Sequence, residues 1–397
     1  MHEKMIVVTK KTMVLKISVR HSGAFEGYFE DALDQRGVEW EYGGDSSDIV
    51  VVEGDPRGNR LSRVENDLLR YQSKSLIAFS VPLQLSFRSR NLGNHNLRTM
   101  DDKATLSQMF ANVPGIPKTW NAKSSEIVRV YERIRTKYPV LILKPSMYSD
   151  RQEGVGVVRS VQDIERWLAS HSKFPLWILQ EFVESSTPYP HYFKANVIIL
   201  STGEAIEWYV YDGATYSGVH EKGNVTSIPL LMSEALALKK SGKVLVGASG
   251  NAERIFDRHF GRGYFKTRIL KQIKTTVAGI AGKMELPNLC HSGNKVCFSI
   301  MSFDFIMAKR PMLLEINTNP FHKVSCYNTK PSTIHARRVL SSPLYKSLSD
   351  WDPCSKFNSA FLAELLDDLL KISLDPLLGL PYKPLTHMML VAKRNLK

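Results

Sequence analysis

The clearest alternation of apolar and polar residues lies at residues 299–320, SIMSFDFIMAKRPMLLEINTNP, and it predicts a β-hairpin. Successive side chains of a strand point to opposite faces. The first run therefore places Phe303, Phe305 and Met307 on one face and Ser302, Asp304 and Ile306 on the other. Residues 308–311 are turn-like, and in the second run Leu313, Glu315 and Asn317 share a face. Because both runs are rich in Phe, Ile, Met and Leu, most of the hairpin should be buried.

A four-residue turn that pairs Met307 with Met312 would place Asp304 directly opposite Glu315. The Cβ atoms of such partners are about 5 Å apart, and like charges placed there destabilise the ladder unless a cation lies between them. An unpaired charge away from water is also costly. The pattern therefore predicts that the two acids share a positive group.

Asn317 adds a neutral oxygen one pleat further along the same face. Two carboxylates and an amide oxygen are hard ligands that suit Mg²⁺, which usually takes one or two carboxylates plus phosphate oxygens of a nucleotide. The alternative is a surface hairpin whose acids are solvated or paired with Lys309 and Arg310.

Apolar spacing divides the rest of the chain into strands and helices. Continuous apolar runs predict strands at 14–19, 48–52 and 76–79, and helical spacing predicts a helix at 24–36. This alternation is typical of a small parallel sheet. The same criteria predict further strands at 140–143, 155–158, 177–183 and 192–200, and helices that start near 103 and span 161–170, 267–283 and 361–372. Residues 218–263 should be loop-rich, and the chain after the last helix should be Pro-rich coil.

The composition is that of an ordinary globular protein, with 43% hydrophobic and 23% charged residues in a chain of 397. No run approaches the roughly 18 apolar residues of a membrane helix, so we expect no membrane insertion. The N-terminus lacks a secretory signal core and four cysteines do not make a disulfide framework, so we expect a cytoplasmic location.

The formal net charge of +14 implies an acidic partner, such as nucleic acid, an anionic membrane surface, an acidic protein tail or a polyphosphate. Solubility conferred by scattered lysines is the alternative, because the basic residues are spread through the chain rather than gathered in one tail.

Lys144 stands at the end of a predicted strand and is followed by a loop, 145–156, that contains Gly154 and Gly156. An ammonium group at a strand end can reach phosphate oxygens, and backbone N–H groups of a glycine loop can fold over them. Glycine is common in ordinary turns and Lys144 could equally be a surface lysine, so this part of the pattern stays ambiguous by itself.

Two further features are consistent with a nucleotide site. An exposed main chain at Gln180, Glu181, Phe182 and Val183 could bind adenine, although a core strand with nothing bound is the alternative. Lys194 lies among the apolar residues of the strand 192–200. A buried lysine needs an anion such as a phosphate, whereas a lysine that snorkels to the surface does not.

The order of these parts resembles the ATP-grasp superfamily and, within it, the tubulin–tyrosine ligase family. The resemblance covers about residues 85–377 in patches. The segments that carry it are NHNLRTMDDKATL (94–106), LILKPS (141–146), GVGVV (154–158), ILQEFVE (178–184), ILKQIKTTV (269–277), LLEINTNP (313–320) with the upstream FDF, and LLDDLLKISLDPL (365–377).

The resemblance implies an α/β (α+β) chain with an ATP-grasp fold and a small N-terminal parallel α/β domain. The domains it implies are an N-terminal α/β domain (1–85), a central ATP-grasp subdomain with the glycine loop (86–175), a C-terminal ATP-grasp subdomain with the metal-binding hairpin (176–378), and a tail (379–397).

The resemblance also implies ATP and Mg²⁺ as cofactors and assigns roles by position. The implied catalytic residues are Lys144, Lys194 and Glu315. The implied ATP contacts are Lys144, Gly154, Gly156, Gln180, Glu181, Phe182, Val183, Lys194 and Asn196. The implied metal ligands are Asp304, Glu315 and Asn317. The chain departs from the family on the strand of Lys194. The family usually has K-F-D-I-R there, whereas this chain has K-A-N-V-I, so that Asn196 stands in place of an acid and Ile198 in place of an arginine.

The leading hypothesis is an ATP- and Mg²⁺-dependent ligase that forms an acyl-phosphate on a protein carboxylate and joins tyrosine, glutamate or glycine to it. The resemblance implies the acidic C-terminal tail of tubulin as acceptor and a microtubule-associated location. One alternative is an ATP-grasp kinase of inositol phosphates, which K-x-N on the Lys194 strand also resembles. The other is an inactive relative that binds nucleotide or an acidic polymer, with nucleic acid the less favoured partner.

Overall fold

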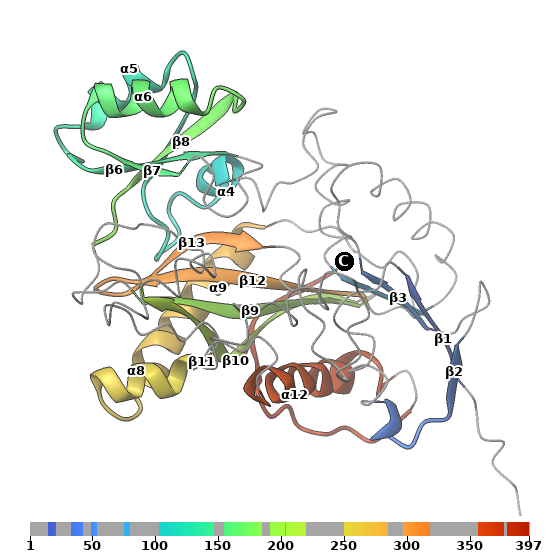
Figure 1. Cartoon of the computed structure of the whole chain (residues 1–397). Helices are drawn as coiled ribbons and strands as arrows, with labels where there is room; N and C mark the ends of the chain where they lie inside the picture. The colour runs from blue at the N-terminus through green and yellow to red at the C-terminus, as the bar shows by residue number, and fades with distance from the viewer. Residues whose placement is uncertain are drawn as a thin grey trace, which may run out of the picture.

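The computed structural model describes residues 15–20, 33–42, 49–53, 75–79, 103–146, 155–184, 191–202, 204–219, 250–284, 297–317, 356–376 and 379–396. These residues form three β-sheets with helices packed around them (Figure 1). The mixed α/β character predicted from the sequence is therefore confirmed.

The N-terminal sheet is parallel, as predicted. Its strands are β1 (Leu15–Arg20), β2 (Trp40–Tyr42), β3 (Ile49–Glu53) and β4 (Ser75–Phe79), in the order β2-β1-β3-β4. Every pairing in it is parallel, and apolar runs such as IVVVE in β3 suit a sheet covered on both faces. Most of the helix predicted at 24–36 lies outside the described residues.

A second, antiparallel sheet has the order β5-β8-β6-β7, with α5 and α6 over one face (Figure 1). Its elements are β5 (Thr119–Lys123), α5 (Ile127–Ile134), β6 (Leu141–Pro145), β7 (Gly156–Val158), α6 (Val161–Ser170) and β8 (Leu176–Glu181). Helix α6 starts where the Ser160 hydroxyl accepts the Asp163 N–H at 3.1 Å, an N-cap. Because β8 lies between β5 and β6, residues 176–181 belong to this sheet.

The largest sheet is antiparallel and has the order β11-β10-β9-β12-β13, with β14 also paired to β10. Its strands are β9 (His191–Ser201), β10 (Ala205–Val219), β11 (Gly250–Asn251), β12 (Cys297–Met307), β13 (Pro311–Asn317) and β14 (Met388–Asn395). One face packs against α8 (Ala252–Phe260), a π-helical turn η1 (Phe265–Leu270) and α9 (Lys271–Lys283). The apolar face predicted for 267–283 is buried there, at Ile269, Ile273, Val277 and Ile280.

Two predictions for described residues of this region are wrong. Residues 252–260, part of the segment 218–263 that was expected to be loop-rich, form helix α8, because Ala252 and Phe256 recur at helical spacing and are buried in the core; residues 220–249 lie outside the description. The tail after residue 379, expected to be coil, ends in strand β14. Its apolar start, MMLVA, follows the Pro-rich stretch and pairs with β10.

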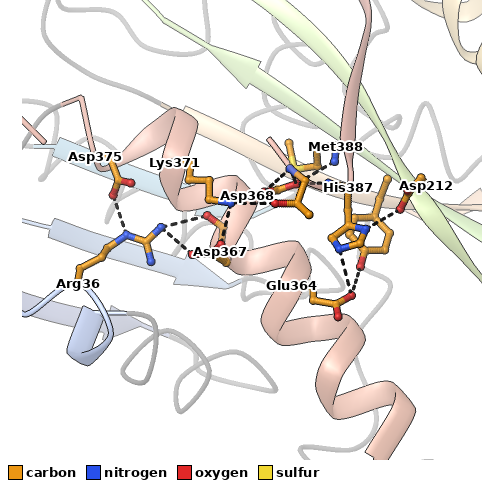
Figure 2. Close-up of polar contacts among 11 residues, drawn as sticks. Arg36, Asp212, Glu364, Asp367, Asp368, Lys371, Asp375, His387 and Met388 are labelled. Carbon is orange, nitrogen blue, oxygen red and sulfur yellow. Dashed lines mark hydrogen bonds and ion pairs between the residues drawn. The ribbon is translucent and has the colours of Figure 1, made fainter. Parts of the chain in front are cut away.

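Helices α4 (Lys103–Met109) and α12 (Lys356–Ser373) complete the described elements. Arg36 joins the C-terminal end of α12 to the N-terminal region (Figure 2). Its Nε lies 2.7 Å from Asp375 Oδ1 and its Nη2 lies 3.1 Å from Asp367 Oδ1. The side chains of Arg36 and Asp375 are each only 5% exposed, so this pair is removed from solvent. Among the helices that the structure describes, none has the length and apolar character needed to span a bilayer.

Asp368 ties α12 to the segment that leads into β14 (Figure 2). Its carboxylate accepts the main-chain N–H groups of Thr386, His387 and Met388 at 2.6 to 3.0 Å, and Lys371 Nζ lies 2.9 Å from it. These bonds lower the pKa of Asp368, although burial alone would raise it. Strand β14 is thus held in place by the hydrogen bonds to Asp368 as well as by its pairing with β10.

Candidate functional site

The predicted hairpin is formed by β12 and β13, but its turn is tighter than expected. Met307 pairs with Pro311, not with Met312, so only residues 308–310 lie in the turn. A register shift follows between Asp304 and Phe305, where Leu314 is the extra residue of a β-bulge. The shift restores the predicted pairing of Asp304 with Glu315, and it lets Phe303, Phe305 and Leu313 all join the apolar core.

A row of charges crosses three adjacent strands at this point. Asp304 on β12 is opposite Lys194 on β9 on one side and opposite Glu315 on β13 on the other. Lys194 Nζ lies 3.0 Å from Asp304 Oδ2. Lys103 Nζ, from the first residue of α4, lies 3.7 Å from Glu315 Oε2. The alternative of a solvated surface hairpin is wrong, because Asp304 is 3% exposed and pairs with a lysine of the neighbouring strand.

One pleat along, a neutral row accompanies the charged one. Asn196, Ser302 and Asn317 are register partners on β9, β12 and β13. The side chains of Asn196 and Ser302 are buried, and Ser302 Oγ donates to Asp304 Oδ1 at 3.1 Å. This bond and the ion pair to Lys194 engage opposite oxygens of Asp304, so they fix the orientation of its carboxylate.

Lys144 adds a third ammonium group. It lies within β6 and is buried, and its Nζ donates to Gln180 Oε1 at 2.9 Å. Burial lowers the pKa of Lys144 to about 8; the Glu315 carboxylate opposes this effect and the Lys103 ammonium adds to it. A buried, cationic lysine near a second cation is a position that an incoming anion would stabilise.

The pKa values of Asp304 and Lys194 are shifted as well. Burial raises the pKa of Asp304, an effect that Lys194 opposes and Glu315 reinforces. Burial alone would lower the pKa of Lys194, but the Asp304 and Glu315 carboxylates outweigh it and raise that pKa. The cluster thus brings three lysine side chains together with two acidic side chains.

The donor set fits Mg²⁺ held together with a nucleotide. Asp304 and Glu315 are directly opposite across the ladder and supply hard oxygen ligands. Within the described segments no group of three or more His, Cys, Asp or Glu side chains could hold a metal by itself. The remaining ligands would be water, phosphate oxygens and Asn317, whose backbone shares the row but whose side chain lies outside the description.

The other predicted nucleotide contacts are only partly visible. Gly154 lies outside the described residues. Gly156 lies on β7, and a Cβ there would come within 2.5 Å of the Trp167 ring, so packing alone requires a glycine. A phosphate contact at Gly156 therefore stays a prediction.

The predicted adenine segment spans the end of β8. Gln180 is committed to its neighbours: besides accepting from Lys144, its Nε2 donates to Thr119 Oγ1 at 3.3 Å. The Glu181 N–H donates to the Lys118 carbonyl at 2.9 Å. Phe182 and Val183 follow the strand, outside its ladder. Main-chain contacts to a base would therefore come most easily from these last two residues.

Sequence reasoning missed Lys103 and Ser302 as members of the site. Lys103 stands in the stretch 94–106 that resembles the ligase family, which was the available signal, but its contact with Glu315 joins residues far apart in sequence. Ser302 was placed on the face of Asp304, two residues away, and that spacing permits the hydrogen bond.

Comparison with known proteins identifies the fold that holds this site. No model of a known protein family matches the chain, and no curated protein sequence is similar to it. Among solved structures, it is similar to the crystal structure of the C-terminal domain of Pby1 from K. lactis, described as an ATP-grasp enzyme that interacts with the mRNA decapping enzyme Dcp2. The TM-score is 0.55 at 13% identity, with 96% of this chain and 98% of that chain covered. The predicted fold is therefore confirmed, and the chain has the ATP-grasp fold.

Proposed function

We propose that the protein is an ATP- and Mg²⁺-dependent ligase that joins an amine to a carboxylate. The observation that carries the proposal is the convergence of Lys144, Lys103 and Lys194 on the acid pair Asp304 and Glu315. Such a cluster complements a nucleotide triphosphate and its cation, with ammonium groups on phosphates and carboxylates on the metal. The ATP-grasp fold supports the same conclusion.

In the proposed reaction a carboxylate oxygen attacks the terminal phosphorus of ATP and ADP leaves. The amine then attacks the acyl carbon, inorganic phosphate leaves, and the proton of the amine passes to water. Lys144 and Lys194 would hold the phosphates, and Asp304, Glu315 and Asn317 would hold Mg²⁺, which neutralises phosphate charge when bound. The buried Lys144 would contribute most, because its ammonium lacks a carboxylate at hydrogen-bond distance among the described residues.

The proposed acceptor is an acidic protein segment, with the tubulin C-terminal tail as the first candidate and tyrosine, glutamate or glycine as the amino acid. The net charge of +14 supports an acidic acceptor, because complementary charge steers encounter. A cytoplasmic, microtubule-associated location follows from this choice and is part of the proposal.

Calorimetry of Mg-ATP binding tests the nucleotide site. The wild type should bind in a Mg²⁺-dependent manner, and Glu315→Gln should weaken binding about tenfold or more, the usual scale for a lost metal partner. Glu132→Gln, an exposed acid on α5, is the matched control and should bind like the wild type. Absence of binding, or equal binding by Glu315→Gln, would contradict the proposal.

Release of ADP in the presence of tubulin and each amino acid tests the reaction. Inositol phosphate kinase activity is the second candidate, favoured by the buried, uncharged Asn196 one pleat from Lys194. Phosphate transfer to inositol polyphosphates without amino-acid incorporation would select it. Salt-sensitive binding to acidic polymers that is indifferent to ATP would instead indicate a binding protein.

A further inference from the structure

Both carboxylates of the hairpin already have a lysine as counter-ion. Lys194 Nζ is 3.0 Å from Asp304 Oδ2, and Lys103 Nζ is 3.7 Å from Glu315 Oε2. A divalent cation that approached this pair alone would meet two ammonium groups and would have to displace them. Displaced ammonium groups lose their ion pairs, which is costly where they are shielded from water.

The two lysines belong to different parts of the fold. Lys194 lies within β9 at the centre of the large sheet. Lys103 begins α4, and its main-chain N–H donates to the Ser146 carbonyl at 3.1 Å, just beyond β6. The backbone of Lys103 thus belongs with the strand of Lys144, whereas its side chain reaches the hairpin. A phosphate group near Lys144 would also be near the Lys103 ammonium, which contributes to lowering the pKa of Lys144.

We infer that Lys103 and Lys194 make cation binding at the hairpin depend on nucleotide. While phosphates are absent the lysines neutralise Glu315 and Asp304. When a cation–nucleotide complex enters, the ammonium groups pair with phosphate oxygens and the carboxylates become ligands of the cation. Every ammonium group and every carboxylate keeps a partner of opposite charge in this exchange, whereas a cation alone offers the lysines no new partner. The inference rests on the proposed function and adds to it the requirement that cation and nucleotide bind together.

Lys103 is the better residue for a test. Asp304 is buried, so removing Lys194 would take an ammonium group away from a buried acid and would also affect stability. The side chains of Lys103 and Glu315 are 13% and 19% exposed, so Glu315 can be reached by water or a cation once Lys103 is removed. Lys103→Met should therefore have two effects of opposite sign. It should strengthen binding of a cation alone and weaken binding of the nucleotide.

The experiment uses Mn²⁺ as the probe and the full chain, with free Mn²⁺ followed by electron paramagnetic resonance, with and without ADP. In the wild type ADP should tighten Mn²⁺ binding at least about tenfold, a coupling of the usual size for linked ligands. Lys103→Met should bind Mn²⁺ alone about fivefold more tightly, the scale of one partly exposed ion pair, and should bind ADP about fivefold more weakly. Lys137→Met removes an exposed lysine near the end of α5, changes the net charge equally and should match the wild type.

Equal Mn²⁺ affinity with and without ADP in the wild type would overturn the inference, and this comparison needs no variant. Unchanged Mn²⁺ affinity in Lys103→Met would overturn it as well. In either case the proposed function would still stand if Glu315→Gln weakened nucleotide binding, so the two failures are distinguishable. If nucleotide failed to bind under any condition, the proposed function and the inference would fall together.

Discussion

Replacing Lys144 by methionine should make the protein more stable and at the same time remove nucleotide binding. Lys144 is buried within β6, and burial lowers its pKa from 10.5 to about 8. At 1.36 kcal/mol for each pKa unit, the charged form is destabilised by about 3 kcal/mol at neutral pH. Methionine is similar in volume and carries no charge. It would leave Gln180 Oε1 without its donor, which costs about 1 to 2 kcal/mol. The net gain in unfolding free energy should be about 1 to 2 kcal/mol.

The gain should depend on pH with a defined sign. Because the pKa of Lys144 is lower in the folded than in the unfolded chain, the folded protein binds fewer protons between pH 8 and 10.5, and the stability of the wild type rises with pH across that window. The methionine variant lacks this contribution. Its advantage should be full at pH 7 and should shrink to about zero by pH 9.5, where most of the charge penalty is relieved.

Urea unfolding followed by tryptophan fluorescence at pH 7 and pH 9.5 measures both effects. Lys194→Met is the matched control with the opposite expectation. Its ammonium is paired with a buried acid, so its loss should destabilise the protein by about 2 kcal/mol. The reasoning would be refuted if Lys144→Met were less stable than the wild type at pH 7, or if its advantage were the same at both pH values. Added stability together with lost Mg-ATP binding would mark Lys144 as a charge kept for function.

Three substitutions elsewhere test the structure around the site. Asp368→Asn removes the charge that accepts three main-chain N–H groups before β14, and urea unfolding should show a loss of about 2 kcal/mol. Arg36→Met leaves the buried Asp375 without its partner, and the same assay should show a loss of about 3 kcal/mol, with an unchanged midpoint arguing against the contact. Gly156→Ala places a Cβ against the Trp167 ring. The midpoint temperature of thermal unfolding should fall by several degrees, which corresponds to a loss of about 1 to 3 kcal/mol in unfolding free energy.

The sequence predicted the hairpin well because its information is local. Alternation at 302–307 identified the faces of the first strand, and the acid pair followed from spacing. The prediction that Leu313 shares a face with Glu315 is wrong, because Leu313 lies with Phe305 in the core. The turn was predicted one residue too long because the bulge at Leu314 cannot be inferred from alternation alone. In the structure β13 also contributes Leu313 and Ile316 to the apolar core. A one-residue insertion is the only way to bury both while Glu315 keeps to the face of Asp304.

What the sequence could not predict depends on distant contacts. Strand β14 follows a Pro-rich stretch and is paired with β10, far back in the chain, so local composition indicated coil. The sequence left Lys194 either an anion such as a phosphate or a position that snorkels to the surface, whereas the described structure supplies Asp304 as its partner through the pairing of β9 with β12. Lys103 reaches Glu315 only after α4 has packed beside the hairpin. Each of these contacts depends on how distant strands and helices pair and pack, and a short stretch of sequence does not contain that information.

The Lys194 strand differs from the corresponding pattern of the ligase family that the sequence resembles by a balanced set of charges. Its K-A-N-V-I has one acid and one base fewer than K-F-D-I-R. An aspartate at position 196 would lie opposite Ser302, one pleat from Asp304, and would add a third negative charge to a buried row. Ile198 is fully buried in this structure, where an arginine would need an anion to offset its desolvation. Either charged residue alone would be unbalanced, whereas the absence of both is consistent with the neutral row of Asn196, Ser302 and Asn317. Phosphate contacts in this chain would then fall to Lys103, Lys144 and Lys194. Replacing Ile198 with arginine alone should destabilise the fold more than replacing Ile198 with arginine and Asn196 with aspartate together.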